Sequence, residues 1–355
     1  MQVSSIGNHQ PLYLGVDMPE TTKIVLAARP HGAPTQGDFR TETAHLPSLQ
    51  DGEVSLETLY LSLDPYMRGR MNDAESYAAA VELGHTMVGG TVSRVLQSQA
   101  DALAEGDIVL GYGGWQTHSV EKATGLVKLD PSRAPISTAL GVLGMPGFTA
   151  YSGLLTIGKP KSGETVVVAA ASGPVGSAVG QIARIKGARA VGIAGGPEKC
   201  AYLKELGFDA AIDHRADDFA EQLAAATPDG IDVYFENVGG KVWDAVLPRL
   251  NEYGRVPVCG LVSGYNATAL PEGPNRAPQL MGMILQKSLT VRGFIQREFV
   301  AEQMGQFVKD MSGWIASGEV KYREDIVDGL DHTVDAFIGL LTGKNFGKLV
   351  VKIAD

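Results

Sequence analysis

The feature that most constrains the fold is a regular alternation of apolar strands and amphipathic helices between residues 165 and 295. Hydrophobic periodicity predicts strands at 165–171, 188–194, 210–214, 231–238, 255–260 and 289–295, and helices at 175–186, 197–206, 217–226, 241–250 and 277–287. The first strand is a continuous β-branched run, as a strand buried on both faces requires. Strict alternation with short connections predicts an α/β unit with a doubly wound, parallel six-stranded sheet.

The chain before this region has a different pattern. Apolar and polar residues alternate at 23–29, 53–63 and 106–112, between turns rich in Gly and Pro, which predicts a partly open antiparallel β-barrel. Residues 298–316 form a long amphipathic pattern outside the β-α alternation, and 347–353 again resembles a strand. We therefore expect a barrel domain of residues 1–147 and 297–355, with residues 148–296 inserted as the second domain.

A glycine-rich turn separates the first predicted strand of the inserted domain from its first helix. It is a Rossmann-type turn in which alanine replaces the first glycine, Ala171-Ser172-Gly173-Pro174-Val175-Gly176. Gly173 allows the backbone to approach a pyrophosphate, and Gly176 allows the helix to pack close to the strand. The helix N-terminus adds N–H groups and partial positive charge. An ordinary tight turn is the alternative, but the strand–turn–helix context favours a dinucleotide site.

The end of the second strand distinguishes NAD from NADP. An NAD-binding domain carries an Asp or Glu there, which binds the ribose hydroxyls. This chain has Gly195-Gly196-Pro197 instead, followed by Lys199, while His214 and Arg215 end the third strand. The missing carboxylate and the nearby basic side chains favour a cofactor with a 2′-phosphate, so we predict NADPH.

Composition excludes several other classes. A net charge of −10 argues against nucleic acid or an anionic membrane as a partner. The two cysteines, Cys200 and Cys259, are too few for a disulfide framework or a four-cysteine zinc lobe, and they suit a reducing cytosol. Residues 1–15 lack the pattern of a signal peptide, and no apolar run is long enough to span a bilayer. A soluble, cytoplasmic protein is expected.

The sequence offers no obvious metal centre or nucleophile. Gly84-His85-Thr86 is similar to the Gly-His-Glu of zinc dehydrogenases, but it lacks the acidic residue, so His85 is interpreted as a loop histidine. No serine elbow and no Cys–His pair is present in a plausible setting. Metal-free hydride transfer by the cofactor is the chemistry that remains.

Eight short motifs together resemble the zinc-independent medium-chain dehydrogenase/reductases, in particular the branch of prostaglandin reductases, alkenal double-bond reductases and NADPH-dependent curcumin reductases. Besides the phosphate loop they are Leu61-Ser62-Leu63-Asp64-Pro65-Tyr66-Met67-Arg68, Met87-Val88-Gly89-Gly90, Gly113-Gly114-Trp115-Gln116, Gly144-Met145-Pro146-Gly147-Phe148-Thr149-Ala150-Tyr151, Glu236-Asn237-Val238-Gly239-Gly240, Cys259-Gly260 with Tyr265-Asn266, and Asn345-Phe346-Gly347-Lys348. The resemblance implies a GroES-like β-domain, a Rossmann domain and an active site in the cleft between them.

The resemblance also implies a set of cofactor contacts. Gly173, Pro174, Val175 and Gly176 would bind the pyrophosphate, and Lys199 the 2′-phosphate. His214 stands where the family usually has a tyrosine, so a protonated imidazole would make 2′-phosphate binding pH-dependent. The remaining predicted contacts are Met145, Thr149, Gly195, Arg215, Asn237, Cys259, Ser263, Tyr265, Phe294, Ile295 and Asn345.

The implied reaction is reduction of the C=C bond of an α,β-unsaturated ketone or aldehyde. Hydride would reach the β-carbon, and Tyr265 would donate to the developing oxyanion, while the α-carbon takes a proton from Tyr265 or from water. Tyr66, Tyr265 and Phe294 are the predicted substrate contacts, and with Trp115 they would suit a flat conjugated substrate. Each of these aromatic residues could equally belong to a core, and Tyr265 could be an ordinary loop tyrosine.

Two other functions stay open. A carbonyl or alcohol oxidoreductase of the same superfamily would produce an alcohol rather than a saturated ketone, and a NADPH-binding sensor would turn over no enone. Relatives in this family are commonly dimers, and an exposed sixth strand could pair across a two-fold axis. We therefore expect a homodimer.

Overall fold

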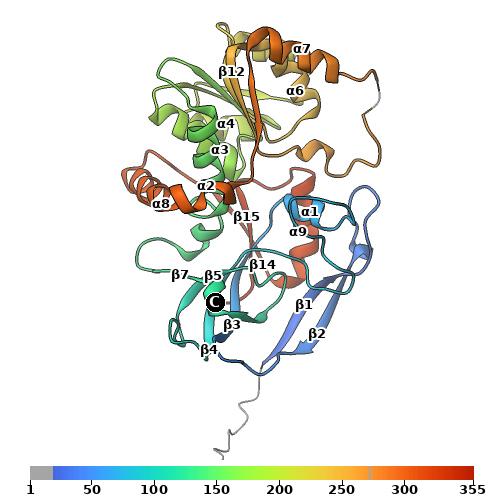
Figure 1. Ribbon diagram of the computed structural model, residues 1–355, viewed down its shortest axis with the longest axis vertical. Helices are drawn as coiled ribbons and strands as arrows, with labels where there is room; N and C mark the ends of the chain where they lie inside the picture. Colours follow the sequence, from blue (N-terminus) through green and yellow to red (C-terminus); the bar gives the residue numbers. More distant parts are fainter. Residues whose placement is uncertain (1–18, 272) are drawn as a thin grey trace, which may run out of the picture.

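The computed structural model describes residues 19–271 and 273–355. These residues form two units stacked along the long axis of the molecule (Figure 1). The upper unit contains a six-stranded sheet, and the lower unit contains a seven-stranded sheet and a separate two-stranded ribbon. This arrangement confirms the predicted fold class, a GroES-like barrel with a Rossmann unit.

All neighbouring strands in the six-stranded sheet are parallel, in the order β10-β9-β8-β11-β12-β13. In chain order this is 3-2-1-4-5-6, the order of a dinucleotide-binding sheet. The strands are β8 (Thr165–Ala169), β9 (Arg189–Ala194), β10 (Ala210–Asp213), β11 (Ile231–Phe235), β12 (Leu250–Val258) and β13 (Thr290–Gly293). The sequence predicted all six, each with its bounds shifted by a few residues.

Helices cover both faces of this sheet, as its buried strands require. Val166 and Val168 of β8 face one apolar cluster, whereas Val167 and Ala169 face another, because successive side chains of a strand alternate between faces. The first cluster is covered by α2 (Met145–Ser152), α3 (Pro174–Ile185), α4 (Pro197–Glu205) and α8 (Val300–Ser317). The second is covered by α5 (Phe219–Ala226), α6 (Gly240–Val246) and α7 (Ala277–Lys287).

The lower unit is built on the sheet β14-β15-β3-β4-β5-β7, with β6 paired to β3. Its last strand, β15, pairs with β3, with Val351 opposite Leu61, so the C-terminal segment lies in the same sheet as β3, β4 and β5. Its elements are β1 (Glu20–Leu26), β2 (Phe39–His45), β3 (Glu53–Ser62), α1 (Tyr66–Arg70), β4 (Thr91–Ser98), β5 (Ile108–Gly111), β6 (His118–Lys122), β7 (Val127–Lys128), β14 (Glu324–Asp328), α9 (Thr333–Leu341) and β15 (Lys348–Lys352).

The position of α8 differs from the expected domain division. We expected the chain to return to the barrel at residue 297, but Phe299, Phe307 and Met311 pack in the same apolar cluster as β8 and α3. Phe307 meets Phe148 and Tyr151 of α2 edge-on, with ring centroids 5.3 and 5.6 Å apart. The amphipathic face of α8 therefore belongs to the Rossmann unit, and the chain reaches the barrel only with β14.

At its C-terminal end, α2 continues into a π-helical turn, Gly153–Gly158, which begins at a point of close packing. A Cβ on Gly153 would lie 2.3 Å from the Phe294 ring and 2.9 Å from the Phe235 ring, so only glycine fits there. This packing holds the C-terminal end of α2 against Phe235 of β11 and Phe294 after β13.

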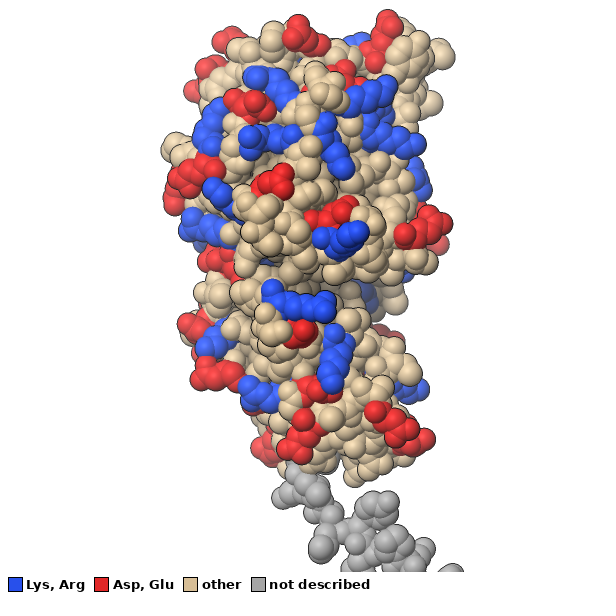
Figure 2. Space-filling view, turned by 90° about the vertical axis from the view of Figure 1, so that its left-hand side faces the viewer, with Lys and Arg blue, Asp and Glu red and all other residues tan. Residues whose placement is uncertain are grey.

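Helix hydropathy and the charges on one face of the molecule both bear on its possible partners. None of the described helices combines the length and apolarity needed to cross a bilayer. On the face shown in Figure 2, basic and acidic side chains are interspersed over both units. Electrostatics on this face therefore gives no support for a polyanionic partner.

Candidate active site

The turn between β8 and α3 has the geometry of a phosphate-binding loop. Gly173 caps α3, and its N–H donates to Ala170 O at 3.0 Å. A Cβ on Gly176 would lie 2.5 Å from Ala170 O and 2.6 Å from Ala171 Cα, so helix and strand meet more closely than any other residue allows. Backbone N–H groups at the start of α3 have no partners within the helix, and an anion can accept their hydrogen bonds.

Basic side chains gather beside the turn after β9. A Cβ on Gly195 would lie 2.9 Å from His214 Nε2 and 3.0 Å from Arg215 Nε, so this glycine makes room for both bases. Asp213 holds the two turns together, because its Oδ1 accepts hydrogen bonds from the N–H groups of Gly196 and Arg215, each at 2.9 Å.

The electrostatics of this corner favours an anion. Burial lowers the pKa of His214, and the charges of Lys241 and Arg215 lower it further. Burial and the Arg215 charge likewise lower the pKa of Lys199. His214 Nδ1 is buried and has no hydrogen-bond partner among the described residues. A bound phosphate would offset the repulsion between these basic side chains and could supply a hydrogen-bond partner for the ring nitrogen.

The lower unit reaches this corner through the segment before β15. Lys199 Nζ donates to Gly343 O at 2.8 Å, and the Tyr202 ring meets the Phe346 ring edge-on at 5.1 Å. Asn345 is held within the same segment, where its Nδ2 donates to Gly347 O at 2.9 Å. The structure thus brings Asn345 close to α4, although the two lie far apart in the sequence.

A buried carboxylate shapes the turn after β11. Glu236 Oε1 accepts hydrogen bonds from the N–H groups of Val238 and Gly239 at 2.6 and 2.9 Å, and burial raises the pKa of this carboxyl. The next residue, Asn237, donates from Nδ2 to Ala169 O at 2.8 Å, which ties the end of β11 to the end of β8. Ser263 Oγ donates to Val238 O at 2.6 Å. Glu236 belongs to one of the sequence motifs, but the sequence predicts no role for it.

The Tyr265 hydroxyl lies at the carboxyl edge of the parallel sheet. A Cβ on Gly260 would lie 3.1 Å from Tyr265 Oη, which places the phenol just beyond the end of β12. Burial raises the pKa of Tyr265, so the hydroxyl keeps its proton at neutral pH. A half-buried, protonated phenol at this edge can donate to a ligand oxygen.

Tyr66 is the first residue of α1 in the lower unit and is half-buried. Burial raises its pKa, and the nearby groups Asp64, Tyr112 and Tyr77 raise it further. Tyr77 also raises the pKa of Tyr265, so it lies near both predicted tyrosines. The sequence gives no role to Tyr77 or Tyr112.

Two other predicted aromatic residues lie in cores. Phe294 is 6% exposed, and its ring packs against Phe235 and Phe299, so its side chain is not placed to touch a substrate. Trp115 is fully buried and stacks on Phe39 in the lower unit, with ring centroids 5.6 Å apart. These two residues follow the core alternative that their sequence left open.

The other predicted contacts occupy the same edge of the sheet or the start of α2. Thr149 is buried, and its hydroxyl donates to Met145 O at 2.7 Å. Cys259 follows β12, where burial raises the pKa of its thiol to about 12, so the thiol is protonated and unreactive. Ile295 follows Phe294 after β13.

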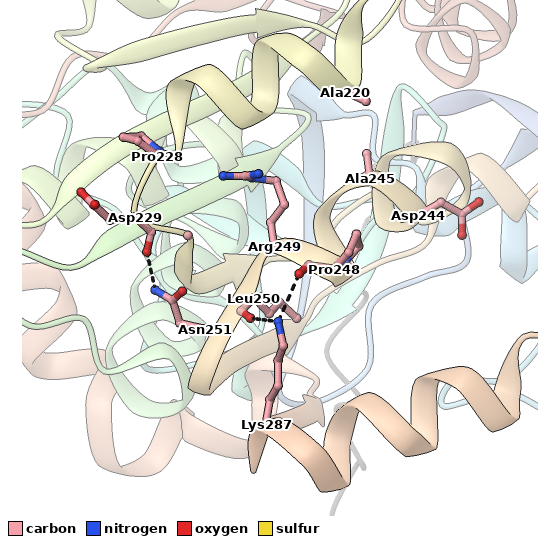
Figure 3. A pocket seen from close by; sticks show the side chains of 11 residues that line it. Ala220, Pro228, Asp229, Asp244, Ala245, Pro248, Arg249, Leu250, Asn251 and Lys287 are labelled. Carbon is pink, nitrogen blue, oxygen red and sulfur yellow. Dashed lines mark hydrogen bonds between the residues drawn. The ribbon is translucent and has the colours of Figure 1, made fainter.

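A hollow of about 740 Å³ lies far from these residues, at the amino end of β11 (Figure 3). Its polar groups serve neighbouring turns: Lys287 Nζ donates to Pro248 O and Leu250 O, and Asn251 Nδ2 donates to Asp229 O. Ligands of open parallel sheets bind outside the carboxyl ends of the strands. We therefore take the phosphate loop and Tyr265, and not this hollow, as the candidate active site.

Comparisons with known proteins identify the family of the chain. A family described as "N-terminal domain of oxidoreductase" matches residues 22–129, and one described as "Zinc-binding dehydrogenase" matches residues 174–312. The chain is 55% identical to the NADPH-dependent curcumin reductase of Escherichia coli, over 96% of this chain and 99% of the relative. It is 43% identical to mouse prostaglandin reductase 1, over 90% and 95% of the two chains.

Two solved structures resemble this chain over most of its length. The NADPH complex of CurA from Vibrio vulnificus superposes with a TM-score of 0.92 and 54% identity, covering 94% of this chain and 99% of that chain. The quinone oxidoreductase of Escherichia coli, at 21% identity and a TM-score of 0.73, shares the fold.

Proposed function

Since this chain belongs to the medium-chain dehydrogenase/reductases, in the branch of the curcumin and prostaglandin reductases, we propose that it reduces the C=C bond of α,β-unsaturated ketones and aldehydes with NADPH. The single observation that carries the proposal is the position of the Tyr265 hydroxyl beside Gly260, at the sheet edge that also carries the phosphate loop. A proton donor there can serve the oxygen of a carbonyl substrate.

The described residues fit the cofactor. The Gly173–Gly176 turn would hold the pyrophosphate, and Lys199, His214 and Arg215 would hold the 2′-phosphate, beside Gly195. The unpartnered His214 Nδ1 supports this assignment. The nicotinamide half would lie among Met145, Thr149, Asn237, Cys259, Ser263, Tyr265, Ile295 and Asn345 and the backbone of Phe294.

When bound, NADPH supplies the hydride that goes to the β-carbon of the substrate. Negative charge then develops on the substrate carbonyl oxygen, and the Tyr265 hydroxyl stabilises it by donating a hydrogen bond. The α-carbon takes a proton from Tyr265 or from water. Tyr66 shapes the substrate side of the site from the lower unit.

The test of this function is consumption of NADPH, compared with NADH, against a panel of enones and enals with identification of the product. We expect saturated ketones or aldehydes and a strong preference for NADPH. An alcohol as the product would favour a carbonyl reductase, and tight NADPH binding without turnover of any compound would favour a sensor.

We also propose that no metal ion takes part. Among the described residues, no group of three or more His, Cys, Asp or Glu side chains is arranged to hold an ion. His85 is largely exposed, and its nearest charged partner is the exposed Glu82 at 3.6 Å. Activity that persists after exhaustive chelation supports the proposal, and activity restored only by added zinc contradicts it.

We propose further that the protein is a cytoplasmic homodimer. All four residues of the edge strand β13 are exposed, and Met281 and Leu285 of the neighbouring α7 are 64% and 81% exposed. An unpaired edge beside apolar side chains favours pairing with a second copy across a two-fold axis. Val291→Lys should yield monomers in light scattering, whereas Val308→Lys, on the exposed face of α8, should not. Two free cysteines suit a reducing compartment, which cell fractionation tests.

A further inference from the structure

Arg68 is a buried cation whose hydrogen-bond acceptors are all neutral. Its side chain belongs to α1, the residue is 2% exposed, and burial lowers the pKa of its guanidinium. Nη1 donates to Asn72 Oδ1 at 2.6 Å, Nη2 to Gly32 O at 2.8 Å, and Nε to Asn266 Oδ1 at 3.1 Å. Burying a charge is costly unless its donors are satisfied, so this arrangement needs each of these acceptors.

The acceptors, which include Pro30 O beside Gly32, come from three separate segments, one of which belongs to the other unit. Asn72 follows α1, and Gly32 lies between β1 and β2, both in the lower unit. Asn266 lies in the Rossmann unit, in the loop between β12 and α7. A Cβ on Gly32 would lie 3.6 Å from Thr268 Cγ2 and 3.9 Å from Asn266 O, so the two loops themselves are close together. One guanidinium thus bridges the two units.

The bridge reaches the residue next to Tyr265. Before Tyr265, the loop is tied to its own unit, because Val262 N–H donates to Asn237 O at 3.2 Å and Ser263 N–H to Val238 O at 3.0 Å. After Asn266, residues 267–271 are exposed. The Arg68–Asn266 hydrogen bond therefore restrains the loop immediately after Tyr265, at the point where it leaves the Rossmann unit.

We propose that Arg68 is a positioning residue. Through Asn266 it holds the Tyr265 phenol at the sheet edge and ties the lower unit to the Rossmann unit. The reaction step rests on the proposed function, but the bridge itself does not. Displacing a catalytic group by about 1 Å can lower a rate by roughly 100-fold. Loss of the bridge should therefore lower kcat more than it raises the KM for NADPH.

The sharpest test compares Asn266→Ala with Asn72→Ala, because each removes one side-chain acceptor from the same guanidinium. Only the first cuts the bridge between the units. We expect Asn266→Ala to lower kcat by roughly tenfold or more and to speed amide hydrogen exchange in residues 261–271. Asn72→Ala should change neither, and Asn266→Asp, which keeps an acceptor oxygen, should restore kcat and protection.

The outcomes separate the bridge from the reaction. Equal effects of Asn266→Ala and Asn72→Ala on kcat and on exchange would overturn the proposal, since Arg68 would then only stabilise its own unit. Unchanged exchange in Asn266→Ala would overturn it as well. If the unaltered protein reduces no enone, the proposed function fails, and the exchange measurement still decides whether the bridge holds the loop.

Discussion

Lys348 Nζ lies 3.0 Å from Asp64 Oδ1, and only 3% and 8% of the two side chains are exposed. The same ammonium donates to Leu63 O at 2.8 Å, and the Ser62 hydroxyl donates to the other oxygen of Asp64. This buried pair joins β15 to the turn that precedes α1 and Tyr66. The last strand of the chain thus fixes the position of the turn that leads into Tyr66, a residue of the candidate site.

Lys348→Met should therefore be strongly destabilising. It leaves the Asp64 carboxylate buried without its cation, which typically costs about 3–5 kcal/mol of unfolding free energy. Denaturant unfolding measures the change. The control is Lys352→Met on the same strand, whose partner Asp355 is 98% exposed, so its loss should cost less than about 1 kcal/mol. Equal losses in the two variants would contradict the interpretation.

Gly176→Ala should abolish tight NADPH binding. The added methyl group would lie 2.5 Å from Ala170 O, so the phosphate loop must move away from α3. Fluorescence titration with NADPH checks this. Gly305→Ala, on α8 with nothing within 4 Å of its added Cβ, should bind NADPH as tightly as the unaltered protein. Retained affinity in Gly176→Ala would mean that the pyrophosphate lies elsewhere.

NADPH binding should involve proton uptake at His214. In the free protein, burial and nearby positive charges lower the pKa of His214 below its usual 6.5, so the ring is neutral at pH 7. A bound 2′-phosphate favours the charged ring and raises this pKa. The affinity for NADPH should therefore increase as the pH falls through the range between the pKa of His214 in the bound protein and its pKa in the free protein.

Two comparisons isolate this effect from titration of the phosphate itself, whose pKa of about 6 lies in the same range. NADH lacks the 2′-phosphate, so its binding should not show the gain. His214→Gln should lose the gain with NADPH while keeping the contribution of the phosphate. Identical pH profiles for His214→Gln and the unaltered protein would exclude His214 from phosphate binding.

Tyr265→Phe should lower kcat by roughly 100-fold if the phenol donates to the developing oxyanion. Affinity for NADPH should stay the same, and kcat should be independent of pH around neutrality because the pKa of Tyr265 is raised above 10. Steady-state kinetics and a cofactor titration measure both quantities. Tyr66→Phe is the matched control and should change kcat by about threefold or less, since it shapes the site without donating a proton. A Tyr265→Phe variant with full kcat would assign the proton to water.

The Rossmann unit could be predicted because each strand is short, apolar and followed by an amphipathic helix. Where local pattern is weak, prediction failed: β2 is Phe39–His45 with mostly exposed residues, and α2 contains Pro146 and Gly147. These elements form because tertiary contacts outweigh their low intrinsic propensity. The position of α8 was unpredictable for a related reason, since an apolar helix face does not specify which unit it covers.

The candidate site shows the same limit. The Rossmann turn and the missing acid after β9 are local signals, and they led to Gly173, Gly176 and Lys199. The sequence leaves Phe294 and Trp115 equally open as site residues or core residues, because burial depends on the partners that surround each ring. The Arg68–Asn266 bridge joins residues 198 positions apart, and no local pattern connects them.

The most direct test of the account is the destination of the hydride. The protein is incubated with NADPH deuterated at the transferable position and a simple enone, and the product is analysed by NMR. We predict a saturated ketone with deuterium on the β-carbon and a solvent proton on the α-carbon. Deuterium on the former carbonyl carbon, in an allylic alcohol, would contradict double-bond reduction and identify the protein as a carbonyl reductase.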